Sequence, residues 1–520
     1  MLPKLLSILL ALVFAANGTV VYVDNTLSHL PVDTILSWYK FLDTAYGTRT
    51  YNPSKRTSIG GTKRAYNSLF HAFICVVPGD TIQMRAGTYE ESFDFIDYRK
   101  FSQRKQGYLM SYPGEWAIIK GTLQYRGIYG SQYLNFQDFE ISGGCISVAN
   151  PRHMSFQELY IHDNPVQPPG REYFGGGITL YNSDGAAQDN LIKNCWLTNN
   201  GNANIKLFGD YYSNPTLIDN KLALMHNEIC YNYLQGATRT IHYKNLQFLC
   251  KDNNGSDMSN SGCGDKIHHN LIRNSSEPIF FGQDFMQIYS NIFQDLQIEN
   301  GERYAGKREP FYVYIYNNLF VRSSLTINHN NNASDRSESY FVDTKGTFKL
   351  HPYSYVYNNI FFDMPTVEGT FPIEILRSDG EWNVNQIDLS TVHIGRNLFY
   401  PFLKTDWCII IGYKMDQFSV YSVGHFAFPQ TNFASSSGTL FSSSQESHLN
   451  SSFSVDGNQT IQTCGINVAH TYLKNVAVPG YIGPFKDANN DWLDSLIPQL
   501  GLRKHVPISL DSFAISGAKP

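Results

Sequence analysis

The segment YVYIYNNLFVRSS, from Tyr312 to Ser324, returns in altered form as YSYVYNNIFFDM, from Tyr353 to Met364. Both segments contain an alternating apolar run, an asparagine pair, and then Leu or Ile followed by Phe. Nine copies of this pattern can be aligned on one polar position, with spacings of 20 to 43 residues. The aligned residues are Asp138, Glu158, Asn194, Asn227, Asn270, Asn291, Asn318, Asn359 and Asn397. A repeat of this length suits one rung of a parallel β-helix, with three short strands and three bends.

The repeat also predicts where the core and the polar groups lie. In each rung alternate side chains point inward, and because one rung cannot bury its apolar face alone, the rungs stack. A buried Asn can donate and accept hydrogen bonds, and it tolerates the left-handed backbone of a sharp bend. We therefore expect the aligned residues to mark one corner of successive rungs. Antiparallel hairpins with Asn-rich turns are the alternative, but they would not keep one register through nine copies.

The composition agrees with strands and excludes some partners. Charged residues make up only 16% of the 520 residues, whereas Tyr and Phe number 34 each. Such a composition favours strands and tight turns over long solvated helices. The net charge is −5 and long Lys/Arg blocks are missing, which argues against nucleic acid as a partner.

The first residues, MLPKLLSILLALVFAANG, are typical of a signal peptide over residues 1–18. A membrane anchor is the alternative, although the apolar run is short for a bilayer span. Asn-x-Ser/Thr sequons also predict a secreted, extracellular glycoprotein; among them are the sequons that begin at Asn254, Asn274, Asn332, Asn450 and Asn458. The eight cysteines allow disulfide bonds in an oxidising compartment, and Cys250–Cys263 is the best candidate pair.

The segment YNSLFHAFICVVPGDTIQMRAGTYEES, Tyr66 to Ser92, predicts an amphipathic helix, a turn and a strand. This order resembles the start of the pectate-lyase-like right-handed β-helix superfamily, where a helix precedes PGDTI and GTY. The resemblance implies an all-β, right-handed, single-stranded parallel β-helix with a short N-terminal capping helix. We expect the β-helix domain over residues 19–432, a Ser-rich loop or linker over 433–477, and a C-terminal cap over 478–520.

A parallel β-helix presents a long sheet face that suits an extended polymer such as a polysaccharide. Cleavage of an acidic glycan by β-elimination needs a base, and it needs Ca²⁺ or another cation near the uronate carboxylate. The segment from Tyr181 to Ser213 carries candidates on what should be consecutive rungs. Lys206 is the candidate base, and Asp184, Asp189 and Asp210 are candidate Ca²⁺ ligands, because calcium prefers oxygen atoms. Solvated strand and turn positions are the simpler interpretation of each residue.

The segment NLIRNSSEPIFFGQDFMQIYSN, Asn270 to Asn291, resembles a rung of the chondroitinase B and alginate lyase family. In that family an acidic calcium ligand precedes a lysine; Glu277 matches the acidic position, but Gln283 and Asp284 occupy the region of the lysine. Arg239 and Lys244 precede this rung and are candidate substrate-binding cations together with Glu277.

Hydrolysis and a non-catalytic role are the two alternatives to a lyase. Polygalacturonase-like hydrolysis is disfavoured because the DD, GHG and RIK strings of that class are missing. The leading hypothesis is a secreted, monomeric polysaccharide lyase, with Ca²⁺ as its cofactor. The rival is a non-catalytic β-helix that binds glycans or builds an extracellular surface.

Overall fold

A computed structural model of the chain divides into two compact units, residues 1–206 (unit 1) and residues 207–520 (unit 2). The structure describes residues 18–27, 47–76, 78–97, 102–103, 105–167, 175–182, 187–209, 224–245, 265–281, 286–300, 313–329, 342–343, 346–347, 354–357, 359–362, 372–377, 392–395, 397–400, 409–415, 419–425, 433–434, 453–455 and 459–461.

In unit 1 each rung contributes one strand to each of three sheets, which we name sheets I, II and III. Sheet I contains β1 (Val20–Val23), β2 (Gly47–Tyr51), β3 (Lys63–Tyr66), β4 (Thr81–Met84), β7 (Gly107–Ser111), β10 (Leu134–Gln137), β13 (Ser155–Gln157) and β17 (Leu191–Lys193). Sheet II contains β5 (Gly87–Tyr89), β8 (Ala117–Lys120), β11 (Glu140–Ser142), β14 (Tyr160–His162) and β18 (Trp196–Thr198). Sheet III contains β6 (Phe93–Asp97), β9 (Leu123–Gln132), β12 (Ile146–Arg152), β15 (Gly176–Asn182), β16 (Ala187–Gln188) and the beginning of β19 (Ala203–Gly209).

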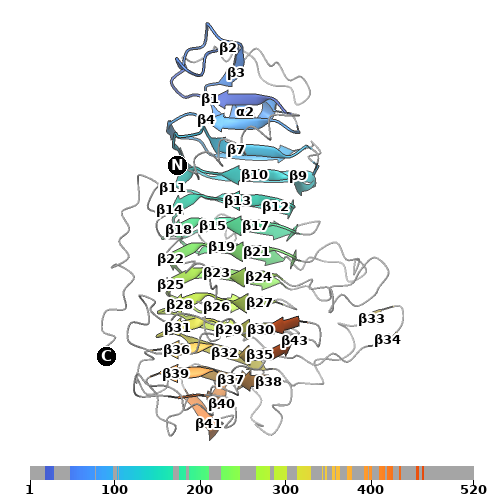
Figure 1. Cartoon of the computed structure of the whole chain (residues 1–520), viewed down its shortest axis with the longest axis vertical. Helices are drawn as coiled ribbons and strands as arrows, with labels where there is room; N and C mark the ends of the chain where they lie inside the picture. Colours follow the sequence, from blue (N-terminus) through green and yellow to red (C-terminus); the bar gives the residue numbers. More distant parts are fainter. Residues whose placement is uncertain are drawn as a thin grey trace. The chain divides into compact units, whose positions relative to one another are not determined.

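Unit 2 repeats the same order of strands, as Figure 1 shows. We give the three corresponding sheets of unit 2 the same names. Sheet I of unit 2 contains β21 (Glu228–Cys230), β24 (Lys266–His268), β27 (Gln287–Tyr289), β30 (Val313–Tyr316), β35 (Ser354–Tyr357) and β38 (Val392–Gly395). Sheet II contains β22 (Tyr233–Ala237), β25 (Leu271–Ser275), β28 (Ile292–Gln294), β31 (Leu319–Val321), β36 (Ile360–Phe362), β39 (Leu398–Tyr400) and β42 (Phe433–Ala434). Sheet III contains β20 (Leu224–Met225), β23 (Arg239–Asn245), β26 (Ile279–Phe281), β29 (Gln297–Asn300), β32 (Ser324–His329), β37 (Ile373–Arg377), β40 (Ile409–Met415) and β41 (Ser419–His425).

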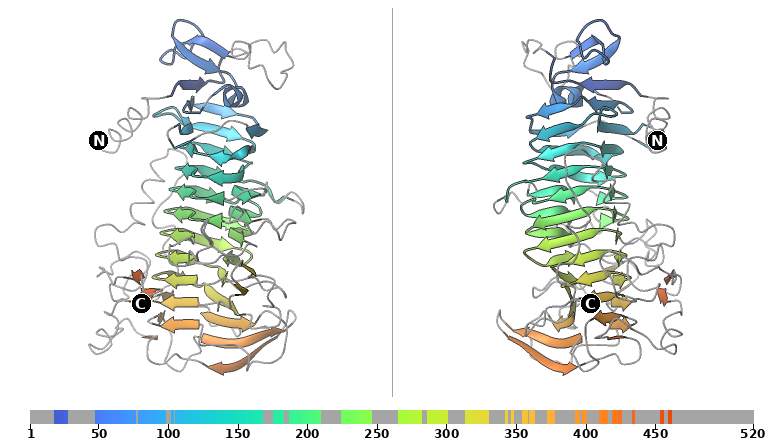
Figure 2. Two further views of the ribbon diagram at one scale, coloured as in Figure 1. Left: turned by 90° about the vertical axis from the view of Figure 1, so that its right-hand side faces the viewer. Right: turned by 60° about the vertical axis from the view of Figure 1, so that its left-hand side comes forward.

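Equivalent strands of successive rungs pair in parallel. Figure 2 shows the stacked rungs of unit 2 from two directions. Antiparallel pairs among the described strands occur only outside this stack: β2–β3, β40–β41, and the hairpins β33 (Val342–Asp343)–β34 (Gly346–Thr347) and β43 (Phe453–Val455)–β44 (Gln459–Ile461). The predicted all-β, right-handed parallel β-helix is therefore confirmed.

The predicted capping helix is also confirmed as α2 (Leu69–Cys75). Ser68 is its N-cap and accepts a hydrogen bond from the backbone N–H of His71. The Glu91 carboxylate accepts from the first two helical N–H groups, those of Leu69 at 2.8 Å and Phe70 at 2.9 Å. A carboxylate at this helix end satisfies donors that have no partner within the helix.

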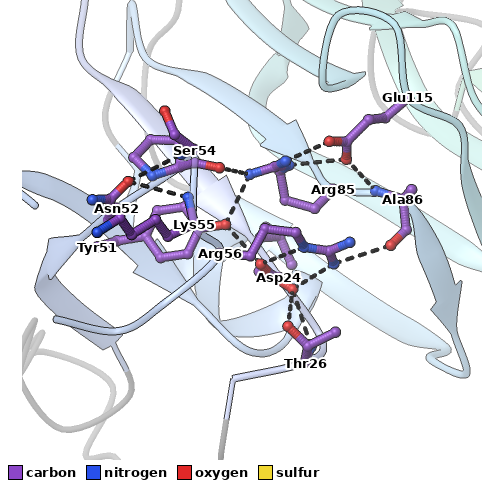
Figure 3. Close-up of polar contacts among 12 residues, drawn as sticks. Asp24, Thr26, Tyr51, Asn52, Ser54, Lys55, Arg56, Arg85, Ala86 and Glu115 are labelled. Carbon is purple, nitrogen blue, oxygen red and sulfur yellow. Dashed lines mark hydrogen bonds and ion pairs between the residues drawn. The ribbon is translucent and has the colours of Figure 1, made fainter. Parts of the chain in front are cut away.

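A buried polar network closes the N-terminal end of unit 1 (Figure 3). The Asp24 carboxylate is fully buried and accepts from the Tyr51 hydroxyl at 2.6 Å and from Arg56 Nε at 3.0 Å. Arg85 donates to the Tyr51 hydroxyl and to both carboxylate oxygens of Glu115. These bonds join β1, the β2–β3 hairpin and the β4 rung, so buried charges in the network are paired.

The corner between sheets I and II carries an asparagine ladder in unit 2. Each side-chain amide donates to the side-chain oxygen of the next rung at 2.9–3.0 Å. Every ladder residue is fully buried, as expected for stacked amides that satisfy one another. The ladder consists of Asn232, Asn270, Asn291, Asn318, Asn359 and Asn397.

In unit 1 the predicted column was wrong by one residue. Asp138, Glu158 and Asn194 have left-handed backbones, with φ of 58°, 56° and 53°, and precede the inward-facing position. The inward positions are the fully buried Phe139, Leu159 and Cys195. The corner uses two residues, one to turn the chain and one to fill the interior, and a polar side chain at the first position does not require a polar side chain at the second.

The copy around Asn227 was also misplaced, because Asn232 supplies the ladder position of that rung. Asn227 lies before β21 and donates from its backbone N–H and its side chain to the Asp265 carboxylate, at 2.8 and 3.0 Å. This is a second, shorter polar stack at the corner that leads into sheet I.

Cys145, Cys195 and Cys230 are buried. The predicted Cys250–Cys263 pair lies outside the described residues, as do residues 1–17 of the predicted signal peptide and the predicted cap 478–520. The described residues of the predicted linker form β42 and the β43–β44 hairpin. Among the described residues no helix has the length and apolar character of a membrane span.

Candidate active site on the outer face of sheet III

Sheet III of unit 1 presents two rows of polar side chains on its outer face. Ser147 on β12 lies opposite Gln124 on β9 and Thr179 on β15. The residues on either side of Ser147, Ile146 and Val148, point inward and are fully buried. Because side chains alternate along a strand, these three polar residues form one outward row across three rungs.

Two hydroxyl groups in this first row are buried. Ser147 and Thr179 are both fully buried, and neither side-chain oxygen has a hydrogen-bond partner among the described residues. Leaving a hydroxyl buried without a partner costs about 1–3 kcal/mol. Adjacent hydroxyls of this kind are therefore typical of a place that receives a polar ligand or water.

Lys206 continues the same row on β19, which neighbours β15 in the sheet. A Cβ atom on Gly177 would lie only 2.8 Å from the Asn204 carbonyl oxygen, so the two strands are side by side at that level. Thr179 and Lys206 each lie two residues further along their strands, so they are also side by side. Their neighbours Ile178 and Ile205 point into the core, and Lys206 is only 2% exposed. The predicted base thus lies buried beside the two hydroxyls.

In the second outward row, Ala149 on β12 lies between Arg126 on β9 and Tyr181 on β15. Arg126 pairs with the Asp94 carboxylate, and both side chains are partly exposed. The Tyr181 hydroxyl lies 3.5 Å from the Gln124 amide nitrogen. Burial raises the pKa of Tyr181, against smaller opposite effects of Gln124 and Arg126, so the phenol keeps its proton at neutral pH.

The predicted calcium ligands are only partly described. Asp184 and Asp210 lie outside the described residues. Asp189 has a left-handed backbone, with φ of 56°, at the corner after β16, and its carboxylate lies 3.5 Å from His153 Nδ1. Calcium requires several oxygen ligands, and one carboxylate beside a histidine does not supply them. The calcium site stays a prediction.

The predicted substrate-binding residues lie in unit 2. Arg239 and Glu277 form an ion pair at 2.6 Å, with 27% and 48% of their side chains exposed. The Glu277 backbone N–H donates to the Thr238 carbonyl at 2.8 Å, which fixes this rung against the preceding one. Lys244 lies on β23 with Arg239, but its side chain is outside the described residues. The structure thus brings two of the three together, and their role in substrate binding stays a prediction.

A cluster that was not predicted from the sequence lies on the outer face of sheet II in unit 1, and we name it the His162 cluster. His162 Nε2 lies 3.1 Å from Glu140 Oε1, and its Nδ1 lies 2.7 Å from Asp163 Oδ2. Trp116 Nε1 donates to the other oxygen of Glu140 at 2.8 Å. The Tyr160 ring stacks on the His162 ring, with centroids 4.3 Å apart.

Burial lowers the pKa of His162, but hydrogen bonds to the carboxylates of Glu140 and Asp163 outweigh it and raise the pKa above its ordinary value. The imidazolium is therefore favoured between two anions. The cluster follows from strand parity: Glu140 pairs with Tyr160, and Tyr160 with Trp196, on β11, β14 and β18. The first and third residues after each corner face outward, and this rule would have found the cluster.

Comparisons with known proteins give no family for the chain and only distant structural similarity. A scan with protein-family models found no match, and a search of curated proteins found none either. One similar solved structure is a mannuronic-acid-specific family 6 polysaccharide lyase from the human gut microbiota, at 14% identity and a TM-score of 0.40 over 62% of this chain and 70% of that chain. A family 6 alginate lyase has 14% identity and a TM-score of 0.34 over 68% and 54% of the two chains. A pectate lyase has 10% identity and a TM-score of 0.32 over 92% of both.

The parallel β-helix of this chain rests on its own strand pairing, not on these neighbours. Identities of this size carry no information about which residues do chemistry.

Proposed function

We propose that this protein is an extracellular polysaccharide lyase that cleaves an acidic glycan by β-elimination on the outer face of sheet III in unit 1. The observation that supports this most is the position of Lys206, which is buried in an outward row beside two buried hydroxyl groups, Ser147 and Thr179. A lysine removed from bulk water is a type of side chain that enzymes use as a general base.

The residues of the two rows match the needs of the reaction. Lys206 takes the proton from the carbon beside the uronate carboxylate, and the electron pair of that C–H bond forms a carbon–carbon double bond. The bond to the glycosidic oxygen breaks, and the leaving oxygen takes the proton of the Tyr181 hydroxyl. Arg126 on the same face attracts the uronate carboxylate and stabilises the negative charge that develops there.

The test is a β-elimination assay on pectate, alginate and glycosaminoglycans, with and without added calcium. The unsaturated product is followed by its ultraviolet absorbance. We expect activity on at least one polymer and a loss of at least about 100-fold in Lys206→Met, which keeps the side-chain length but cannot accept a proton. Lys193→Met is the matched control, since Lys193 lies on β17 of sheet I.

Because Lys206 is buried, each variant is compared with the parent by circular dichroism and thermal unfolding. Tyr181→Phe is the second variant, because it removes only a hydroxyl group and keeps the ring. The proposal is wrong if no polymer yields product, or if folded Lys206→Met retains the parent rate.

The His162 cluster favours a second candidate function, the binding of a glycan without cleavage. Trp116 and Tyr160 are half-buried rings on one sheet face, with hydrogen-bonding carboxylates beside them. Aromatic faces with a few fixed polar groups are typical of ligand sites. Under this hypothesis Trp116→Ala and Tyr160→Ala weaken retention on immobilised glycans by at least about tenfold, whereas Tyr160→Phe, which keeps the ring, does not.

A further inference from the structure

Three side chains that commonly bind metals converge on the outer face of sheet I in unit 2. Glu228 and Cys230 lie two residues apart on β21, so they point to the same face. His268 on β24 lies directly opposite Cys230 in the parallel register. One ligand atom from each of the three residues lies within 4.8 Å of the other two. The sequence separates His268 from the other two, so only the register of the rungs brings them together.

The imidazole of His268 is held on both sides. Its Nε2 lies 2.9 Å from Glu228 Oε1, and its Nδ1 lies 2.7 Å from Nδ1 of His269. A hydrogen between the two Nδ1 atoms leaves Nε2 of His268 to face the carboxylate and the thiol. Metal-binding histidines are usually oriented by such a contact at their second nitrogen.

Aromatic rings fix the two histidines in place. The Tyr289 ring stacks on His268, with centroids 4.7 Å apart and planes inclined by 9°. The Tyr231 ring stacks on His269 at 4.9 Å. Cys230 is buried, whereas 44% of the Glu228 side chain is exposed, so the cluster opens to solvent on the side of the carboxylate.

We propose that Glu228, Cys230 and His268 form a zinc site with one coordination position open to solvent. A thiolate, an imidazole and a carboxylate are the three ligand types that zinc uses, and three protein ligands plus one water complete a tetrahedral site. Calcium prefers oxygen ligands only, so the donor set discriminates against it. The site is separate from the residues of the proposed lyase reaction, and neither proposal depends on the other.

The test uses the full-length protein without a histidine tag, stripped of metal with a chelator. Co²⁺ is added first, because a thiolate ligand gives a charge-transfer band in the near ultraviolet, and Zn²⁺ then displaces it. We expect one Co²⁺ per chain, a charge-transfer band, and loss of the band on addition of Zn²⁺. Calorimetry with Zn²⁺ gives the stoichiometry independently.

The variants assign the ligands. Cys230→Ser should remove the charge-transfer band, and His268→Gln should weaken Zn²⁺ binding by at least about tenfold. Cys195→Ser is the matched control, because Cys195 is also a buried cysteine but belongs to unit 1. Glu228→Gln provides a variant whose partly exposed side chain is not needed for packing.

Absence of stoichiometric Zn²⁺ binding to the folded parent overturns the proposal. Binding with no thiolate band, or a band that persists in Cys230→Ser and disappears in Cys195→Ser, also overturns it. If Zn²⁺ raises the melting temperature of the parent and of Cys195→Ser, but not of folded Glu228→Gln, the assignment is supported without reference to any catalytic assay.

Discussion

Replacing Asn318 by alanine tests whether the asparagine ladder stabilises unit 2. Its Oδ1 accepts from the backbone N–H and the side-chain amide of Asn291, both at 3.0 Å. Its Nδ2 donates to the Ile288 carbonyl at 2.9 Å and to Asn359 Oδ1 at 3.0 Å. Asn359 Oδ1 keeps the bond from the Asn318 backbone, so the main losses fall on the Asn291 N–H and the Ile288 carbonyl.

A buried polar group without its partner costs about 1–3 kcal/mol. With two such groups, we expect Asn318→Ala to lower the free energy of unfolding by about 2–6 kcal/mol. Because each rung contacts only its neighbours, the effect should be concentrated in the rungs before and after Asn318. Denaturant unfolding gives the global change, and hydrogen exchange by mass spectrometry shows which peptides lose protection.

The matched control is Asn194→Ala in unit 1. Asn194 is half-buried at the turning position of its corner, with φ of 53°, and is not a ladder residue. Alanine at a left-handed position costs about 1–2 kcal/mol. If Asn318→Ala is no more destabilising than Asn194→Ala, or if protection falls equally throughout unit 2, stacked amides are not what holds the rungs together.

Three shorter predictions concern unit 1. Burial raises the pKa of Asp24, but hydrogen bonds from Arg56, Tyr51 and Thr26 together lower it to about 2. A lowered pKa stabilises the fold above the ordinary value near 3.9, so Asp24→Asn should cost about 2 kcal/mol at neutral pH, and acid denaturation should show the difference vanishing near pH 2. For His162 the pKa is raised, so the stabilisation is complete below about pH 6.5 and is lost as the pH rises. Melting temperatures of the parent and His162→Gln should therefore converge at high pH. Burial raises the pKa of Cys145 to about 12, so iodoacetamide should modify it only after unfolding, as mass spectrometry can show.

The fold could be predicted because its signals are repeated many times. Alternation of apolar residues defines each strand, and recurrence of the same string defines the rung. The N-terminal helix was predictable for a different reason: the apolar face of residues 69–75 and the N-cap residue Ser68 are local signals in the sequence, which the contact with Glu91 then reinforces. The exact corner position was not predictable from the alignment alone, because Asp138 and Asn318 look equivalent in the sequence. Asp138 occupies the turning position of its corner, whereas Asn318 occupies the inward position, one residue later.

The one-residue difference between the turning and the inward position also explains which candidate site residues could be predicted from the sequence. In a strand, a shift of one residue moves every side chain to the opposite face. Lys206 stands alone as a cation in an apolar strand, so it could be selected without an exact register. The His162 cluster and the Glu228, Cys230 and His268 group each require the correct face on two or more rungs at once. Once the turning residue is separated from the inward residue, the outward positions follow for every rung. The corner therefore specifies both the interior and the chemistry of the surface.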